Sequence, residues 1–455
     1  MHPASTSRPE GSMKLSNFDL FAQLMDEPRY RGNLVGDISA ITQGNRMGVV
    51  ATLLARCALL VMVLALVGCG SLLRNGVPTE MMSSATIPGM PDVRAPAGQA
   101  SPVMERDMAK SFTQESASDF PAGADGVVLY PHLALSGGGA NGAFGVGFLN
   151  GWSSTGKRPT FKVVTGVSTG ALMAPFAFLG PAWDGALREF YTTTQSRDIF
   201  MLGGFRSIIM QLLFGEGIAD TAPLISLIAL HVDEALLRDI AAAHQGGRRL
   251  YIGTVDLDSQ RFIVWNMGLI AMSGHPDALP LFRKIMLASA SIPIAFSPVF
   301  FEVEAAGRRY DEMHVDGGVA AQVFYNGGLF SARELRQNAG RGTARENIYV
   351  IHNGQLAAVT ATTRRSIPSI ALRTLEAASK AAVIADLFRI YALALRERSE
   401  YHWITIPDGI NLTGSEVFDP VVMQKLYDVG YETARAGPIW NTLPPGVSDE
   451  AGGLQ

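Results

Sequence analysis

The chain has 455 residues, enough for two or three domains or for one large α/β domain with extensions. Its formal net charge is −4 and it has no dense run of lysine and arginine, which argues against a nucleic-acid-binding protein. Its two cysteines, Cys57 and Cys69, exclude a disulfide framework and a cysteine-rich metal site.

An apolar run covers residues 57–67, after a polar and irregular stretch. It is shorter than the about 20 residues that a membrane-spanning helix needs, and it suits the apolar region of a secretory signal. The run ends in Leu66-Val67-Gly68-Cys69, which resembles the lipobox of bacterial lipoprotein precursors. In those precursors the signal is cut before the cysteine, and the thiol carries the lipid.

The resemblance implies that residues 1–68 are a leader and signal segment, and that Cys69 is lipidated. It places the protein in the bacterial cell envelope, attached to the bilayer by acyl chains, and in the outer membrane if the source is Gram-negative. An uncleaved anchor over residues 49–67, holding the protein at the inner membrane, is the alternative. Met47 is an alternative start of the chain.

Residues 69–126 are rich in proline, serine, alanine, glycine and methionine and have no apolar period. Such a composition is typical of a flexible tether. We therefore expect this segment to link the membrane to a folded domain without taking part in it.

Strand-like and helix-like runs alternate over residues 127–440. The expected strands are residues 127–136, 161–166, 248–257, 261–267, 298–305 and 347–354. The expected helices are residues 143–152, 169–179, 182–193, 221–244, 281–289, 370–398 and 420–436. The alternation predicts a three-layer α/β/α domain with a largely parallel central sheet. Residues 441–455 are expected to form a loose tail.

A glycine-rich stretch, SGGGANGAFGVG over 136–147, follows the first of these strands and leads into a helix. Backbone N–H groups at such a helix start attract negative charge. The stretch could therefore be an oxyanion hole, a phosphate cradle or simply a tight turn. A dinucleotide site is not favoured, because Lys157 and Arg158 stand where that motif needs an acidic residue.

The second motif is Gly166-Val167-Ser168-Thr169-Gly170, between a strand and a helix. It has the form of a nucleophile elbow, in which a strained turn exposes a serine and glycines are needed because the backbone is crowded. Ser168 is the candidate nucleophile.

A base for Ser168 has two kinds of candidate. A catalytic triad would use a late histidine, His352 or His402, but neither follows an acidic residue in a recognisable turn. In EMHVDGGVA, by contrast, a short strand brings Asp316 to a turn that begins with Gly317. A plain Asp-Gly hairpin turn is the structural alternative.

These three motifs, in this order, resemble the patatin-like phospholipases over roughly residues 127–324, and ASASIP at 288–293 resembles the segment ahead of the family's aspartate. The resemblance implies a lipid acyl hydrolase with a Ser–Asp dyad, Ser168 and Asp316, that acts on membrane lipid and needs no metal or cofactor. It also implies an oxyanion hole and turn-forming glycines. The oxyanion hole would be Gly137, Gly138, Gly139 and Ala140, and the supporting glycines Gly166, Gly170 and Gly317.

Two positions depart from the family pattern. Many members have a basic residue where this chain has Asn141, and the residue before the glycines is Ser136. The missing basic residue leaves the head-group preference open. It also motivates a rival function, a catalytically weak lipid-binding module, beside the rival of a triad esterase.

Two further segments carry weaker indications. Residues 200–215 are apolar and mixed with glycine, which fits a core helix or a lipid-facing lid. Asp256 and Asp258 could bind a cation, but a solvated turn is the favoured reading.

Overall fold

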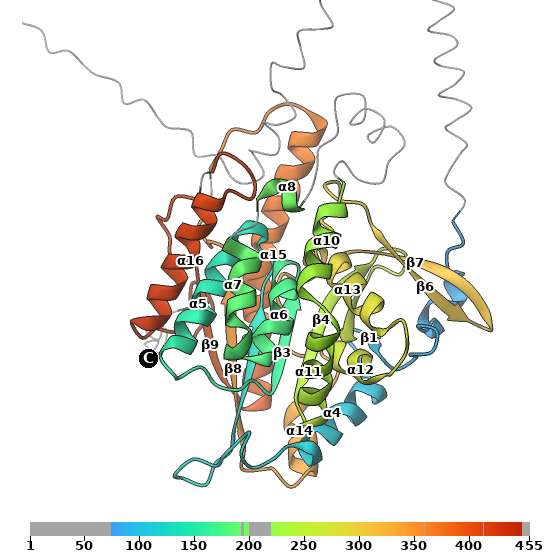
Figure 1. The fold of residues 1–455 in the computed structure, drawn as a ribbon, viewed down its shortest axis with the longest axis vertical. Helices are drawn as coiled ribbons and strands as arrows, with labels where there is room; N and C mark the ends of the chain where they lie inside the picture. The colour runs from blue at the N-terminus through green and yellow to red at the C-terminus, as the bar shows by residue number, and fades with distance from the viewer. Residues whose placement is uncertain (1–73, 193–194, 200–219, 359, 413, 448–455) are drawn as a thin grey trace, which may run out of the picture.

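The computed structural model describes residues 74–447 except 193–194, 200–219, 359 and 413 (Figure 1). The described chain forms one sheet with helices on both faces. The strands are β1 (Arg94–Pro96), β2 (Leu129–Leu135), β3 (Val163–Val167), β4 (Arg249–Asp256), β5 (Arg261–Asn266), β6 (Val299–Ala305), β7 (Arg308–Asp316), β8 (Arg345–His352) and β9 (Glu400–Thr405). Their order is β1-β5-β4-β3-β2-β8-β9, with β7 pairing β4 and β6 pairing β7.

The middle of the sheet is parallel. Strands β4, β3, β2, β8 and β9 pair in parallel, whereas β1, β5, β6 and β7 are joined by antiparallel pairing. Every residue of β3 and β4 is buried, as expected for strands covered by helices on both faces. The predicted three-layer α/β/α fold is confirmed.

The helices divide into two layers. They are α4 (Pro102–Gln114), α5 (Gly142–Ser154), α6 (Thr169–Leu179), α7 (Asp184–Thr192), α8 (Ser196–Ile199), α10 (Ala222–His231), α11 (Glu234–Gln245), α12 (Met267–Met272), α13 (Ala278–Ser289), α14 (Ala332–Asn338), α15 (Ile367–Glu397) and α16 (Pro420–Arg435). The apolar side chains of α5, α6, α10, α11, α13 and α16 share one core with one face of the sheet. Those of α4, α14 and α15 pack on the other face.

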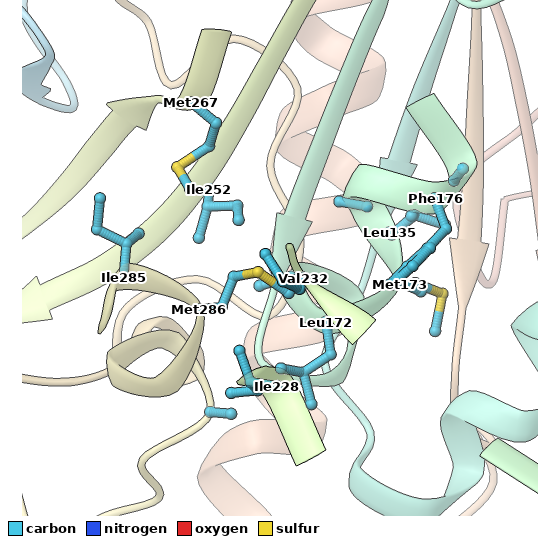
Figure 2. Close-up of a cluster of buried hydrophobic side chains, with 14 of the residues drawn as sticks. Leu135, Leu172, Met173, Phe176, Ile228, Val232, Ile252, Met267, Ile285 and Met286 are labelled. Atoms are coloured by element: carbon cyan, nitrogen blue, oxygen red, sulfur yellow. The ribbon is translucent and has the colours of Figure 1, made fainter. Parts of the chain in front are cut away.

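The larger core supports the helix that follows Ser168. Figure 2 shows Leu172, Met173 and Phe176 of α6 within a cluster that includes Ile252 of β4 and Met286 of α13. All five side chains are buried. The helix is apolar all round, which fits its burial on every side.

The expected flexible tether over residues 69–126 is wrong for the part that the structure describes. Residues 74–126, here called the strap, fold onto the sheet: β1 pairs with β5, and α4 buries Met104, Met108 and Phe112. The apolar period of α4 was hidden by its polar neighbours, since the helix has a negative mean hydropathy and only one buried stripe.

Buried charges also hold the strap. Lys162, directly before β3, has its Nζ 2.6 Å from the Glu115 carboxylate, and Arg94 pairs with Glu312 of β7. Arg74, at the start of the strap, pairs with Asp258 and Asp311. Because an unpaired buried charge is costly, these pairs fix where the strap lies on the sheet.

Three smaller differences concern helices and the tail. The helix expected over residues 221–244 is two, α10 and α11, separated where Asp233 caps α11 by accepting a hydrogen bond from Leu236 N–H. Helix α12 was not expected. The first residues of the expected loose tail contact β9. Asn441 pairs with Trp403, and the Leu443 carbonyl accepts a hydrogen bond from the Trp403 indole.

The part of the chain that the structure describes contains no helix with the length and apolar character needed to cross a bilayer.

If the strap is part of the fold, Phe112→Ala should lower the free energy of unfolding by about 3–5 kcal/mol, because it removes a buried aromatic ring from the second core. Thr113→Ala, at the neighbouring exposed position, should change it by less than about 0.5 kcal/mol. Denaturant unfolding followed by circular dichroism measures both. If both substitutions changed the free energy of unfolding by the same small amount, the strap would be a tether and not part of the fold.

Candidate active site

Ser168 occupies a strained turn between β3 and α6. Its φ is 54° and its ψ −125°, a backbone conformation that residues other than glycine rarely adopt. The serine is held there by its own N–H, which donates to the Ser289 hydroxyl at 3.0 Å. That hydroxyl donates in turn to the Gly253 carbonyl at 2.7 Å. The strain is thus maintained by contacts from β4 and α13.

The glycines on either side of Ser168 are required by space. A Cβ atom at Gly166 would lie 2.4 Å from the Gly170 carbonyl oxygen, and one at Gly170 would lie 2.3 Å from the Leu135 carbonyl oxygen. Both distances are far below a normal contact. The crowding expected of a nucleophile elbow is therefore present.

Asp316 ends β7 and lies opposite Thr254 in the β4–β7 register. Its N–H donates to the Ser291 carbonyl at 2.9 Å, and its Oδ1 accepts a hydrogen bond from Gly318 N–H at 2.7 Å. Gly317 has no room for a side chain, since a Cβ atom would lie 2.5 Å from the Gly253 carbonyl oxygen. The carboxylate is therefore oriented by main-chain contacts.

The second carboxylate oxygen of Asp316, Oδ2, is buried and has no regular hydrogen-bond partner among the described residues. Burial raises the pKa of Asp316 to about 7, while hydrogen bonding from Ser168 and from Gly318 N–H lowers it. The Ser168 side chain is therefore one of the two groups that favour the charged form of this carboxyl group. A carboxylate with a pKa near neutrality is a much stronger base than an ordinary aspartate.

The glycine-rich loop bends sharply beside Ser168. Gly138 has a φ of 152° and Gly139 a φ of 55°. A Cβ atom at Gly138 would lie 2.1 Å from the Asn353 carbonyl oxygen, so only glycine fits there. No described residue accepts a hydrogen bond from the N–H groups of Gly138 and Gly139. Both N–H groups are therefore available to bind an oxyanion.

One member of the expected oxyanion hole is corrected by this geometry. The N–H of Gly137 donates to the Gln322 carbonyl at 2.9 Å, so it is not free to bind an oxyanion. Gly137 instead lies behind the serine, where a Cβ atom would be 3.2 Å from the Ser168 Cβ. Ala140 lines a cavity together with Ser168, and the binding of an oxyanion by its N–H stays a prediction.

Asn353, which follows β8, was missed by the sequence analysis. Its N–H and its side-chain Nδ2 donate to the hydroxyl and the carbonyl of Ser136, at 2.8 and 3.0 Å, and its Oδ1 accepts from Gly145 N–H at 3.1 Å. Asn353 therefore ties the loop to the neighbouring strand. Its position after a strand that pairs with β2 is the only sequence signal that could have indicated it.

The two histidines considered as bases have other contacts. His352 Nδ1 lies 3.1 Å from the Ser136 hydroxyl, and burial lowers its pKa to about 4, so it is neutral at pH 7. His402 stacks on Tyr349 with a ring distance of 5.1 Å. Neither forms a described hydrogen bond with Ser168.

A cavity of about 560 Å³ joins these groups. Ser168, Asp316 and the loop from Gly137 to Asn141 line one side of it, and the α15 residues Leu372, Leu375 and Val383 are part of the other. A smaller apolar pocket opens directly beside Ser168, between Leu172, Phe190 and Phe296. The arrangement brings together a serine hydroxyl, a buried carboxyl group, backbone N–H groups and apolar walls.

Residues 133–326 match the family model of the patatin-like phospholipases. The matched segment begins in β2 and includes the glycine-rich loop, the Ser168 turn and Asp316. No curated protein matches the chain.

Among solved structures, the chain is similar to the crystal structure of VipD from Legionella pneumophila. The identity is 13%, the match covers 70% of this chain and 69% of that one, and the TM-score is 0.34. A likeness of this size says nothing about the activity or partners of this chain.

The other residues that the sequence analysis considered for a site either form ion pairs and hydrogen bonds within the fold or lie outside the described residues. Asp258 pairs with Arg74, and Asp256 accepts hydrogen bonds from Asp258 N–H and the Ser259 hydroxyl. No cluster of metal-ligating side chains occurs in the described part of the chain. Cys69 and residues 200–215 lie outside it.

The raised pKa of Asp316 makes a prediction about stability. The folded state holds the proton more tightly than the unfolded chain, so the native protein loses stability as the pH rises from about 4 to about 7. Asp316→Asn removes this loss. At about 1.4 kcal/mol per pKa unit, its free energy of unfolding should exceed that of the parent by about 2 kcal/mol at pH 5 and about 4 kcal/mol at pH 8.

Denaturant titrations at the two pH values measure this difference. Asp258→Asn serves as the control, because the Arg74 partner lowers the pKa of Asp258. Its loss of stability should be the same at pH 5 and pH 8, where the carboxylate is ionised in both states. An Asp316→Asn advantage that does not grow with pH would contradict the buried, proton-binding carboxylate.

Proposed function

We propose that the protein is a lipid acyl hydrolase, a serine esterase of phospholipase A or lysophospholipase type, with Ser168 and Asp316 as its catalytic dyad. The observation that carries the proposal is the meeting of a strained serine with a buried carboxylate whose pKa is raised to about 7. The patatin-like match over residues 133–326 supports the same chemistry.

In the first half of the reaction, Asp316 accepts the proton of the Ser168 hydroxyl while Oγ attacks the ester carbonyl carbon. Gly138 and Gly139 line the cavity, and their N–H groups stabilise the negative charge on the carbonyl oxygen. When the intermediate collapses, the bond to the alcohol breaks, and Asp316 returns the proton to the leaving oxygen. The acyl group stays on Ser168.

In the second half, Asp316 takes a proton from water, which attacks the acyl-enzyme carbonyl. Collapse breaks the bond to Oγ, releases the fatty acid and returns the proton to Ser168. One residue thus serves as base and acid in turn, which requires a pKa near the working pH. Asp316 meets this requirement.

The shape of the site favours a lipid substrate. The apolar pocket beside Ser168 suits the first part of an acyl chain, and the larger cavity accommodates the rest of the molecule. On the far wall Lys380 donates to the carbonyls of Gln355 and Ala357, and burial lowers its pKa. This cation is a candidate contact for a polar head group.

Two rival functions have less support. A triad esterase needs a histidine beside Ser168, and His352 is instead bonded to Ser136. A lipid-binding module without activity needs neither the strained serine nor a buried carboxylate with an unpaired oxygen. Labelling by a fluorophosphonate separates an enzyme from a binding module, since only an activated serine reacts.

The location is also a proposal. We infer from Leu66-Val67-Gly68-Cys69 that the protein is a lipoprotein of the bacterial cell envelope, held at the bilayer by acyl chains on Cys69. An uncleaved anchor over residues 49–67 is the alternative. Either anchor would place the enzyme at the surface that contains its substrate.

Ser168→Ala and Asp316→Asn should each lower kcat/KM by about 10³-fold or more, and the double variant should be little worse, because the two groups act as a unit. In the parent, kcat/KM should fall as the pH drops below about 7, where Asp316 takes up its proton. Initial rates on a phospholipid and on a short-chain ester measure both effects. Additive losses, or full activity of Asp316→Asn, would refute the dyad.

Histidine variants serve as the controls. His402→Ala changes a side chain on β9 and should leave the rate unchanged. His352→Asn keeps a polar group towards Ser136 and should retain most of the activity. A loss at His352 as large as that at Ser168 would favour the triad.

The anchor is tested by Cys69→Ser. Two or more acyl chains hold a protein stably at a membrane, whereas one holds it marginally. Radiolabelled palmitate should enter the parent but not the variant, which should accumulate as an unprocessed precursor. Equal labelling of both, or a mature N-terminus well before residue 69, would favour the uncleaved anchor.

A further inference from the structure

Four exposed apolar side chains belong to segments that line the cavity and are here called the apolar rim. They are Ile294, Val319, Ile367 and Ile370, with 43, 44, 86 and 52% of their surfaces exposed. Val319 itself lines the cavity, and Ile294 lies between Pro293 and Ala295, which line it as well. Single exposed apolar residues are common, but a group around the opening of a site indicates a binding surface.

Ile367 and Ile370 belong to the first turns of α15, which continues into the cavity wall through Leu372 and Leu375. Figure 1 shows this beginning of α15, in orange, at the top of the molecule. The exposed Arg365 lies two positions before this helix, next to its N-cap Ser366. An apolar tip beside a positive charge suits the boundary between lipid head groups and acyl chains.

Ile294 has a backbone conformation that is unfavourable for a β-branched side chain. Its φ is 73°, a left-handed conformation that is a true outlier for a β-branched residue. The strained turn follows Ser291, whose carbonyl accepts the hydrogen bond from Asp316 N–H. Backbone strain of this kind clusters at functional sites. Here it displays an apolar side chain to the outside next to the candidate base.

The place where the chain enters the domain limits how the domain can turn. Arg74 is fixed by ion pairs with Asp258 and Asp311, and its guanidinium lies over the Phe300 ring. Asp311 precedes Asp316 by five positions on β7, or about 17 Å of strand. The start of the described chain therefore lies on the edge of the sheet that also carries Asp316.

The chain before Arg74 is short. Cys69 lies five positions before it, so the lipidated thiol would be within about 18 Å of Arg74 even if the chain were fully extended. The apolar run of the alternative anchor ends at Val67, which adds only two residues. In both cases a domain held this closely cannot turn its β6–β7 side away from the bilayer.

We propose that the apolar rim is the membrane-docking face of the domain and that its partner is the lipid bilayer to which the chain is anchored. The inference rests on the proposed anchor and deepens the proposed function, because it makes the cavity open onto the lipid. A substrate then passes from the bilayer into the site between apolar side chains, without crossing water.

The first test measures depth in the membrane. The full chain with Cys57→Ala and Cys69→Ala keeps its apolar run and has no other cysteine. A fluorophore is placed at Ile367→Cys or, as the matched control, at Ile439→Cys, which is 93% exposed and lies beyond α16. The proteins are reconstituted into phosphatidylcholine vesicles that contain spin-labelled lipid.

Quenching by the labelled lipid should be at least threefold stronger at position 367 than at position 439. Equal quenching at the two positions would overturn the proposed orientation. This readout does not use activity, so it holds whether or not the protein is a hydrolase.

The second test uses the anchored full chain and compares two substrates. Ile367→Asp with Ile370→Asp should lower hydrolysis of vesicle phospholipid at least fivefold and leave hydrolysis of a soluble short-chain ester unchanged. Asp in the first turn suits a helix start, so the fold should persist. Ile439→Asp should change neither rate. Equal rates of the rim variant and the parent on vesicles would overturn the proposal, whereas a parent inactive on both substrates would overturn the proposed function alone.

Discussion

The site depends on one buried carboxylate. One carboxylate oxygen of Asp316 accepts a hydrogen bond from the Gly318 N–H, while the other oxygen has no regular partner among the described residues. Its burial is costly to the fold and raises its pKa to about 7. In the proposed mechanism, this raised pKa makes Asp316 a base that can act on a serine without a histidine. Three contacts position Asp316: its pairing with Thr254 of β4, the close approach of Gly317 to the Gly253 carbonyl, and the hydrogen bond from its N–H to the Ser291 carbonyl.

The fold brings the other residues of the site close to this carboxylate. The parallel strands β2, β3 and β8 end side by side, so the loops that follow them meet. The glycine-rich loop follows β2, Ser168 follows β3 and Asn353 follows β8. Three segments far apart in the sequence thus share one cavity, and the Ser136–Asn353 hydrogen bonds keep the first in place against the third.

The sequence allowed the layers, the parallel sheet and the Ser168 and Asp316 turns to be predicted, because strand periodicity and crowded glycines are local signals. It did not allow the strap to be predicted, since its order comes from distant partners such as Glu312 and Lys162. Nor could the engaged N–H of Gly137 or the role of Asn353 be foreseen. Both depend on which strands lie next to each other, which composition does not encode.

The strap also affects when the domain can complete its fold. Its residues are made early, but Arg94 pairs with Glu312 and Arg74 with Asp311, which are made more than two hundred residues later. Contacts so distant in sequence close late and slowly. A nascent chain can therefore pair β1 with β5 once β5 has been made, but the ion pairs of Arg74 with Asp311 and of Arg94 with Glu312 cannot form before β7 has been synthesised.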